Sequence, residues 1–417
     1  MSRFLSLLAA ACLFLLVAYL FFSLDSEPHR QWYKGNTHTH SLWSDGNDFP
    51  EMIVDWYHRE NYHFLALSDH NILSRGEKWM EVGAIRSRQK AVGRTALQKL
   101  EARYGAEWIE RRMNDKGKEE VRLRALEEFR GRYEEPGKFL LIEAEEVTDG
   151  FRGKPVHLNA INLKELIPPQ KGGSVVEVIR NNYKAVEAQE ARTGQKILMH
   201  INHPNFGWGI TPNDVAQALE ARYFEVYNGH PSINHLGDAE HPGDERLWDL
   251  ANTLRLTQLN APPLYGLGTD DSHTYHGGDV SPGRGWIMVH ATKLDPEALI
   301  TAMRAGRFYA SSGVSLDKIR YDAVRRELRF QILPDPGVTY ETKIIGSRPT
   351  EGLAGTGVVL ATSTGTEVRY QLKEGEIYAR ATVTSSTLHP NPSYKGQKKQ
   401  AWTQPVGWKP TLAEAAK

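Results

Sequence analysis

The chain has 417 residues, with 51 Lys and Arg against 51 Asp and Glu, and 40% of its residues are hydrophobic. This composition excludes a wholly disordered or low-complexity protein, because it supplies enough apolar surface for a packed core. The balanced charge argues against general nucleic-acid binding, which needs a basic excess. A single cysteine, Cys12, excludes an intrachain disulfide and a thiolate zinc site, so any metal must be held by His, Asp and Glu.

Residues 1–28 are predicted to form a membrane anchor or signal segment. Phe4–Leu24 is a run of 21 uncharged residues, and a helix of that length can cross a hydrocarbon core of about 30 Å. The run ends in a poor cleavage site, so we expect an uncleaved anchor, with a cleaved signal segment and lipidation at Cys12 as alternatives. Arg3 favours a catalytic domain outside the cytoplasm, periplasmic or extracellular, and secreted if the segment is cleaved.

Residues 29–313 alternate short apolar strands with helices, which is typical of an α/β fold with parallel strands. The predicted strands are Phe64–Leu67, Phe139–Ile142, Ile197–Met199, Phe224–Tyr227, Leu264–Leu267 and Trp286–Val289. Helices are predicted to begin near Pro50, Pro212 and Pro296, because proline is favoured in the first turn of a helix.

Two segments depart from this pattern. Residues 77–135 are highly charged with apolar residues at helical spacing, which predicts an inserted helical subdomain, either a lid over the site or a solvated appendage. Residues 314–417 contain strand-like runs separated by Gly-rich turns, which predict a small C-terminal antiparallel β domain. The residues from about Pro390 onward are expected to form a loosely docked tail.

Metal-binding side chains recur near the ends of the predicted strands. The strand ends of a parallel α/β fold meet at one face, so residues far apart in sequence can share one pocket. In His38-Thr39-His40 the two rings lie on the same side of an extended segment and can hold one ion at about 2.0–2.1 Å. Asp271 and His273 have the same spacing. The other candidates are Asp45, His70, Glu145, Glu146, His157 and His203.

Six histidines and three carboxylates exceed the needs of one cation. They suit two or three divalent ions, with a bridging carboxylate between neighbours about 3.5–4 Å apart. Carboxylates are needed because neutral imidazoles cannot offset several positive charges in a dry cleft. His200 could contact the ligands from behind. We interpret the remaining histidines as structural or surface residues: His58, His63, His230, His235, His241, His276, His290 and His389.

The series resembles the PHP (polymerase and histidinol phosphatase) metal-dependent hydrolases, in particular the branch that includes carbamate-ester hydrolases. The matching motifs are His38-Thr39-His40-Ser41 through Ser44-Asp45-Gly46, Ser68-Asp69-His70-Asn71, Ala144-Glu145-Glu146-Val147-Thr148, the single histidines His157 and His203, and Thr269-Asp270-Asp271-Ser272-His273. The resemblance covers roughly residues 33–313. It implies a distorted (β/α)7 barrel holding two or three divalent ions, which could be Mn, Zn or Fe.

The resemblance also implies which side chains are ligands. It makes Glu146 the bridging ligand, with Glu145 as the alternative, and the Asp-x-His spacing favours Asp271 over Asp270. The implied metal ligands are His38, His40, Asp45, His70, Glu146, His157, His203, Asp271 and His273.

The first functional hypothesis is hydrolysis of a small-molecule phosphoester by metal-activated water. Asp69 and Asp270 are expected to orient neighbouring imidazoles, and Arg284 is a candidate anion clamp, since a guanidinium pairs bidentately with phosphate. Asn228 ends another strand and is expected to line the pocket. Hydrolysis of a carboxyl ester or carbamate is the chemical alternative. A non-catalytic exported binding protein is the alternative of another class.

Overall fold

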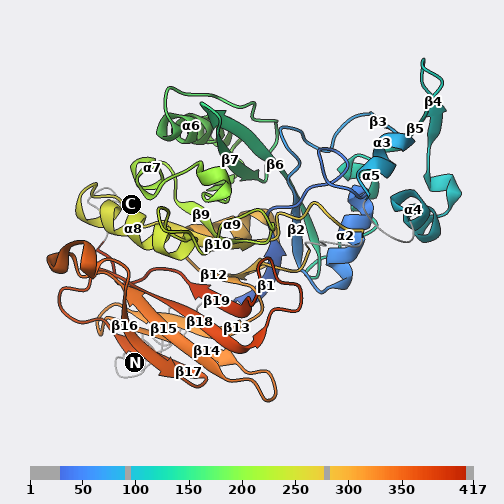
Figure 1. Ribbon diagram of the computed structural model, residues 1–417. Coiled ribbons are helices and arrows are strands. Elements are labelled where there is room, and N and C mark those ends of the chain that lie inside the picture. The colour runs from blue at the N-terminus through green and yellow to red at the C-terminus, as the bar shows by residue number, and fades with distance from the viewer. Residues whose placement is uncertain (1–28, 90–94, 277–281, 410–417) are drawn as a thin grey trace, which may run out of the picture.

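The computed structural model describes residues 29–89, 95–276 and 282–409 (Figure 1). Within these ranges no helix combines the length and apolar character needed to cross a bilayer. The predicted anchor, Phe4–Leu24, lies outside the described residues.

One mixed sheet of 13 strands runs through the molecule. Its hydrogen-bonded order is β10 (Tyr265–Thr269), β9 (Tyr223–Asn228), β8 (Leu198–Ile201), β7 (Lys154–Ile161), β6 (Leu140–Phe151), β2 (Phe64–Leu67), β1 (Gln31–Asn36), β11 (Trp286–Ala291), β12 (Phe308–Ser311), β19 (Lys398–Thr403), β18 (Ala379–Leu388), β15 (Tyr340–Gly346) and β16 (Val358–Thr364). All six strands predicted between residues 64 and 289 are present within a residue or two of their expected starts.

The sheet combines parallel and antiparallel pairs. Strand pairs β1–β2, β2–β6, β8–β9 and β9–β10 are parallel, as expected for an α/β fold. By contrast, β6, β7 and β8 are antiparallel neighbours, because a tight turn at Arg152 and Gly153, both with positive φ, replaces a helical crossover. The order of the described strands runs from β10 to β16 and does not close. The predicted (β/α)7 barrel is therefore not confirmed, although an isolated parallel bridge between Thr39 and Ser272 joins the segments that follow β1 and β10.

Five helices accompany the strands of the α/β part: α2 (Pro50–Arg59), α6 (Val175–Thr193), α7 (Pro212–Gln217), α8 (Asp244–Thr257) and α9 (Pro296–Arg304). Three of them begin at the predicted prolines. The Thr211 side chain accepts a hydrogen bond from the Asp214 amide, and the Asp295 side chain accepts one from the Ala298 amide, so both helix starts are capped.

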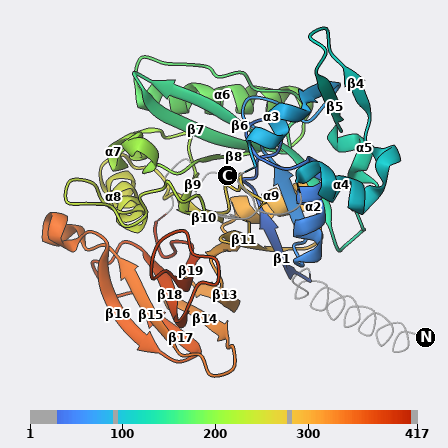
Figure 2. The same ribbon diagram turned by 45° about the vertical axis from the view of Figure 1, so that its right-hand side comes forward.

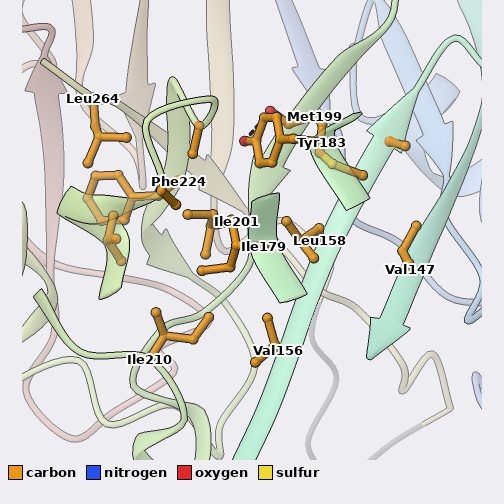
Figure 3. Packing of buried hydrophobic residues seen from close by; sticks show 14 of the residues in the cluster. Val147, Val156, Leu158, Ile179, Tyr183, Met199, Ile201, Ile210, Phe224 and Leu264 are labelled. Atoms are coloured by element: carbon orange, nitrogen blue, oxygen red, sulfur yellow. Dashed lines mark hydrogen bonds between the residues drawn. The ribbon is translucent and has the colours of Figure 1, made fainter. Parts of the chain in front are cut away.

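Helix α6 packs its apolar face on the sheet beside the region where β7, β8 and β9 meet (Figure 3). The Tyr183 hydroxyl of α6 donates to the Met199 carbonyl at 2.9 Å, so this buried polar group is satisfied. The cluster includes Val156, Leu158, Ile179, Tyr183, Met199, Ile201 and Phe224.

The insertion at residues 77–135 is not purely helical, which corrects the prediction. It contains β3 (Lys78–Glu81), α3 (Val82–Ser87), α4 (Ala96–Tyr104), the 3-10 turn η1 (Ala106–Trp108), β4 (Arg111–Met113), β5 (Glu119–Leu123) and α5 (Leu126–Arg130). Strands β3, β5 and β4 form an antiparallel sheet that extends from one end of the molecule (Figure 1). The turn between β4 and β5 contains Gly117, which has φ +67°. In β5, Val121 and Leu123 are the buried residues of an alternating pattern.

The C-terminal strands form two facing sheets. β13 (Ser315–Asp322), β14 (Glu327–Leu333) and β17 (Glu367–Gln371) make the second sheet (Figure 2). Their apolar side chains pack against those of β15 and β18. A 3-10 segment, η3 (Pro349–Gly355), precedes β16. The predicted loose tail is wrong for its described part, because β19 lies between β12 and β18 and buries Ala401 and Trp402.

Candidate metal centre

His38 and His40 stand on the extended segment that follows β1, and both rings are fully buried. Side chains alternate along extended backbone, so the two rings share a side. The His38 Nε2 atom lies 3.5 Å from Oε2 of Glu146 and 3.2 Å from Oδ1 of Asp271. The corresponding distances from His40 Nε2 are 3.2 and 3.1 Å. The predicted pair therefore meets two predicted carboxylates.

Glu146 is at the centre of the cluster. It follows the stretch of β6 that pairs with β2, and its backbone forms a bridge with His70 just beyond β2. Its carboxylate lies 2.8 Å from His70 Nδ1, 3.1 Å from His157 Nδ1 and 3.3 Å from His203 Nε2. Five imidazoles thus surround one buried carboxylate.

Glu145, the alternative bridging ligand, faces the other side of β6. Its Oε1 atom accepts a hydrogen bond from the Ile167 amide at 2.6 Å. Consecutive residues of a strand point to opposite faces, so only one of the pair can join the cluster. The geometry selects Glu146.

Asp271 rather than Asp270 enters the cluster, as the Asp-x-His spacing predicts. Asp271 has φ +48°, a conformation that turns the chain sharply beyond β10. Asp270 is also buried, but it accepts hydrogen bonds from the backbone amides of residues 283–285 at 2.6–2.9 Å. It therefore anchors that loop. Asp270 was expected to orient an imidazole, but its hydrogen bonds to the described residues do not include one.

Asp45, His70 and His273 form the more exposed side of the site with His40. Asp45 Oδ1 lies 3.3 Å from His273 Nε2, and its Oδ2 lies 3.5 Å from His70 Nε2. The Asp45 side chain is 54% exposed, whereas the other carboxylates of the site are buried. This side can meet solvent or a substrate.

All nine predicted ligand side chains come together in four overlapping groups, each with its ligand atoms within 4.8 Å of one another. The groups are His40, Asp45, His70 and His273; His38, Glu146 and His203; His38, His40 and Asp271; and His70, Glu146 and His157. Four converging buried atoms lack a hydrogen-bond partner among the described residues: His38 Nε2, His40 Nε2, Glu146 Oε2 and Asp271 Oδ1. Buried polar atoms without partners are costly, and a coordinated cation would satisfy them. The donor set therefore fits divalent metal ions.

The acidic and basic groups of the cluster strongly shift one another's pKa values. Burial alone raises the pKa of Glu146, but the surrounding imidazoles of His38, His70 and His157 outweigh it and hold the pKa well below its usual value. Burial lowers the pKa of His38, yet the carboxylates of Asp271, Glu225 and Glu146 raise it well above its usual value. Each group depends on a nearby opposite charge, and a divalent cation supplies such a charge to the carboxylates.

Sequence reasoning missed Glu225, a buried carboxylate on β9. Its Oε1 atom lies 2.7 Å from His38 Nδ1 and 3.8 Å from His200 Nδ1. His200 therefore stands behind the ligands, as expected. Asn202 was also missed, and its side chain donates to Glu146 Oε1 at 2.8 Å. The available signal for Glu225 was a charged residue inside the apolar strand Phe224–Tyr227.

Asp69 does not contact an imidazole through any of its hydrogen bonds within the described ranges. Its carboxylate accepts from the Ser41 amide at 2.8 Å, from the Ser41 hydroxyl at 2.7 Å and from the Ser44 hydroxyl at 2.6 Å. It fixes the loop between His40 and Asp45, so any effect on the site is indirect.

Arg284 does not line the pocket. Its guanidinium is buried and donates to the Gly229 carbonyl at 2.8 Å and to Asn391 Oδ1 at 3.2–3.3 Å. These bonds join the loop after β9 to the segment before β19. The predicted anion clamp is corrected to a structural arginine, because its donors are already engaged by neutral oxygens.

A pocket of about 200 Å³ opens onto the cluster. Apart from predicted ligands, its lining residues are Phe206, His230 and Ile233. His230, interpreted from sequence as structural or surface, is thus part of the site wall. Its Nδ1 atom accepts from the Ser232 amide at 3.2 Å, and burial lowers its pKa to about 4. A neutral His230 therefore carries its ring proton on Nε2. No described residue of the insertion lines this pocket, so the lid interpretation gains no support.

No protein-family model matches the chain, and no curated protein matches it. Among solved structures, it is similar to a two-domain protein from Bacteroides vulgatus that contains a predicted PHP-like metal-dependent phosphoesterase, with 17% identity and a TM-score of 0.39 over 89% of this chain and 95% of that one. It is also similar to a candidate metal-dependent phosphoesterase from Bifidobacterium adolescentis, with 13% identity and a TM-score of 0.31 over 65% of this chain and 95% of that one. At such low identity and TM-score, the likenesses assign no activity to this chain.

Proposed function

We propose that the protein is a metal-dependent hydrolase of ester bonds, with a phosphoester as the first candidate substrate. The observation that carries the proposal is the convergence of nine His, Asp and Glu side chains in four overlapping groups beside an open pocket. Two or three divalent ions, Mn, Zn or Fe, would suit this donor set. Such ions activate a water molecule as nucleophile and neutralise charge on the reacting oxygens.

The chain's own residues supply positioning and shape. Glu146 and Asp271 each lie 3.1–3.5 Å from the Nε2 atoms of the two histidines of the first motif, so these four side chains face one common space. Phe206 and Ile233 limit the access of water to one wall of the pocket. The Nε2–H group of His230 is a hydrogen-bond donor available beside the ligand set.

A second candidate, hydrolysis of a carboxyl ester or carbamate, is favoured by the composition of the pocket. None of the described lining residues is Lys or Arg, and two of them, Phe206 and Ile233, are apolar. Sites that select phosphate commonly use guanidinium or ammonium groups as clamps. An uncharged ester with an apolar substituent would fit this lining without such a clamp.

A substrate panel tests both candidates. Purified protein loaded with Mn²⁺, Zn²⁺ or Fe²⁺ is assayed on a phosphate monoester, a phosphate diester, a carboxyl ester and a carbamate, each releasing nitrophenol or naphthol. Phosphoester turnover that disappears in the double variant His38→Ala, His40→Ala supports the first candidate. Ester turnover without phosphoester turnover would replace it with the second. Activity that survives in the double variant, or no turnover at all, would favour a non-catalytic binding protein.

We also propose that residues 1–28 hold the protein at a membrane with its catalytic part outside the cytoplasm. The uncharged run Phe4–Leu24 supports this location. Cell fractionation with protease protection tests it. Protein found in the membrane fraction and digested from outside the cytoplasmic membrane is the expected result, and protein in the cytoplasmic fraction would contradict it.

A further inference from the structure

Glu225 is buried directly behind the candidate metal centre, with 1% of its surface exposed. It lies on β9, where the neighbouring residues Phe224 and Val226 are also buried. Burying a carboxylate is expensive unless it is well hydrogen bonded. A charged side chain at this position therefore needs a reason beyond packing.

Four donors surround the Glu225 carboxylate. Oε1 lies 2.7 Å from His38 Nδ1 and accepts from the Thr269 hydroxyl at 2.8 Å. Oε2 accepts from the His203 amide and from the Asn228 side chain, both at 2.8 Å. An ionised carboxylate accepts hydrogen bonds and donates none, and its two oxygens can accept about four, so the four donors match an ionised Glu225.

These bonds reach three of the nine candidate ligands. A proton on His38 Nδ1 leaves the Nε2 lone pair facing Glu146 and Asp271, and Nε2 has no other hydrogen-bond partner within the described residues. The bond to the His203 amide fixes a backbone with φ +22°. The Asn228 side chain that donates to Glu225 also donates to Asp271 Oδ2 at 3.1 Å.

We propose that Glu225 is a positioning residue of the metal centre: it sets the tautomer of His38 and, through backbone and amide contacts, orients His203 and Asp271. The inference rests on the proposed function, because it assumes that the cluster binds metal. Carboxylates that accept the remote N–H group of a ligating histidine fix its ring, and their loss typically weakens metal binding by about 10–100-fold.

The experiment compares full-length wild-type protein with the variants Glu225→Gln and Glu376→Gln. Glu376 is a matched control, because it is also a buried glutamate with several donors but lies in the loop between β17 and β18, where it accepts from the Tyr370 hydroxyl at 2.9–3.0 Å. Zn²⁺ and Mn²⁺ affinities are measured by competition with a chelating dye. Nitrogen-15 shifts of the zinc-loaded protein report which His38 nitrogen carries the proton, assigned with a His38→Gln variant.

The expected result is metal binding weakened by about 10–100-fold in Glu225→Gln and unchanged in Glu376→Gln. Equal affinities in wild type and Glu225→Gln would overturn the inference. If Glu225→Gln fails to fold, the spectrum of the zinc-loaded wild-type protein decides: a His38 proton on Nδ1 supports the proposal, and a proton on Nε2 overturns it. A wild-type protein that binds no metal would instead overturn the proposed function, so the two failures are distinct.

Discussion

Glu145 and Glu146 are consecutive residues of β6 whose carboxylates serve opposite faces of the strand. Glu146 Oε2 lies 2.8 Å from His70 Nδ1 inside the cluster, whereas Glu145 Oε1 accepts a hydrogen bond from the Ile167 amide at 2.6 Å. Both side chains are fully buried. The pair therefore separates the effect of losing any buried carboxylate from the effect of losing a metal ligand.

Glu146→Gln is predicted to impair metal binding and activity much more than Glu145→Gln. Glutamine removes the negative charge that five imidazoles and the bound cations share. We expect activity to fall by more than the roughly 100-fold typical for groups that only support a ligand. Metal content by mass spectrometry and turnover at saturating metal measure the effect.

Glu145→Gln is the control and should keep metal content and turnover within a few-fold of wild type. Equal losses in both variants would show that a general disturbance of β6, and not the ligand role of Glu146, accounts for the effect.

Glu51 is predicted to make stability depend on pH. Its Oε1 atom accepts from Trp108 Nε1 at 2.9 Å, while Oε2 has no hydrogen-bond partner among the described residues, and burial raises the pKa to about 7 from 4.5. The folded state then binds more protons than the unfolded state between pH 4.5 and 7, so stability falls as pH rises through that range.

In Glu51→Gln this fall is absent. The unfolding free energy of the variant relative to that of wild type should rise by on the order of 3 kcal/mol between pH 4.5 and 8. Any effect of the amide itself is the same at every pH and does not change this difference. Urea unfolding at several pH values measures the difference. Parallel stability curves for the two proteins would contradict the raised pKa.

Arg380 and Asp249 form a buried ion pair that joins β18 to α8. The guanidinium donates to Asp249 at 2.8 and 2.9 Å, and the Tyr378 hydroxyl donates to the same carboxylate at 2.7 Å. Asp249→Ala should destabilise the protein by about 3–5 kcal/mol, because it leaves the buried charge with poorer compensation. The double variant Asp249→Leu, Arg380→Met should recover most of this loss in denaturant unfolding. A double variant as unstable as the single one would show that packing, not the unpaired charge, sets the cost.

Trp402 tests the finding that β19 is an integral strand. Its side chain is 2% exposed and stacks on Tyr227 with ring centroids 5.6 Å apart. Trp402→Ala should cost about 3–5 kcal/mol in unfolding free energy. Leu388→Ala, at a side chain that is 63% exposed, should change it by less than about 0.5 kcal/mol. Similar small effects at both positions would show that the segment docks only loosely and is not an integral strand.

The ligand set could be predicted from sequence because its signals are local. Alternation along a strand places His38 and His40 together, and motif spacing separates Asp271 from Asp270. Strand positions were also predictable, since β2, β8 and β9 are fully buried and read as apolar runs. The antiparallel pairing of β6 with β7 was not predictable, because it depends on a turn and on long-range contacts.

The roles of Glu225 and Arg284 could not be predicted, because they depend on where each side chain points in the folded protein. Arg284 follows a ligand motif, yet its side chain turns to carbonyl oxygens away from the pocket. Glu225 lies within an apolar strand, and only the fold reveals His38 beside it. The strands of the insertion carry mostly charged residues, β4 is exposed throughout, and the apolar alternation of β5 is limited to Val121 and Leu123, which is too short to predict a strand.

The most direct test of the account is anomalous diffraction from crystals of the wild-type protein soaked in Mn²⁺ or Zn²⁺. The account predicts two or three anomalous peaks among His38, His40, Glu146 and Asp271 and their neighbours in the four groups. Crystals soaked in the ion that show no anomalous peak among these side chains would contradict the proposed metal centre.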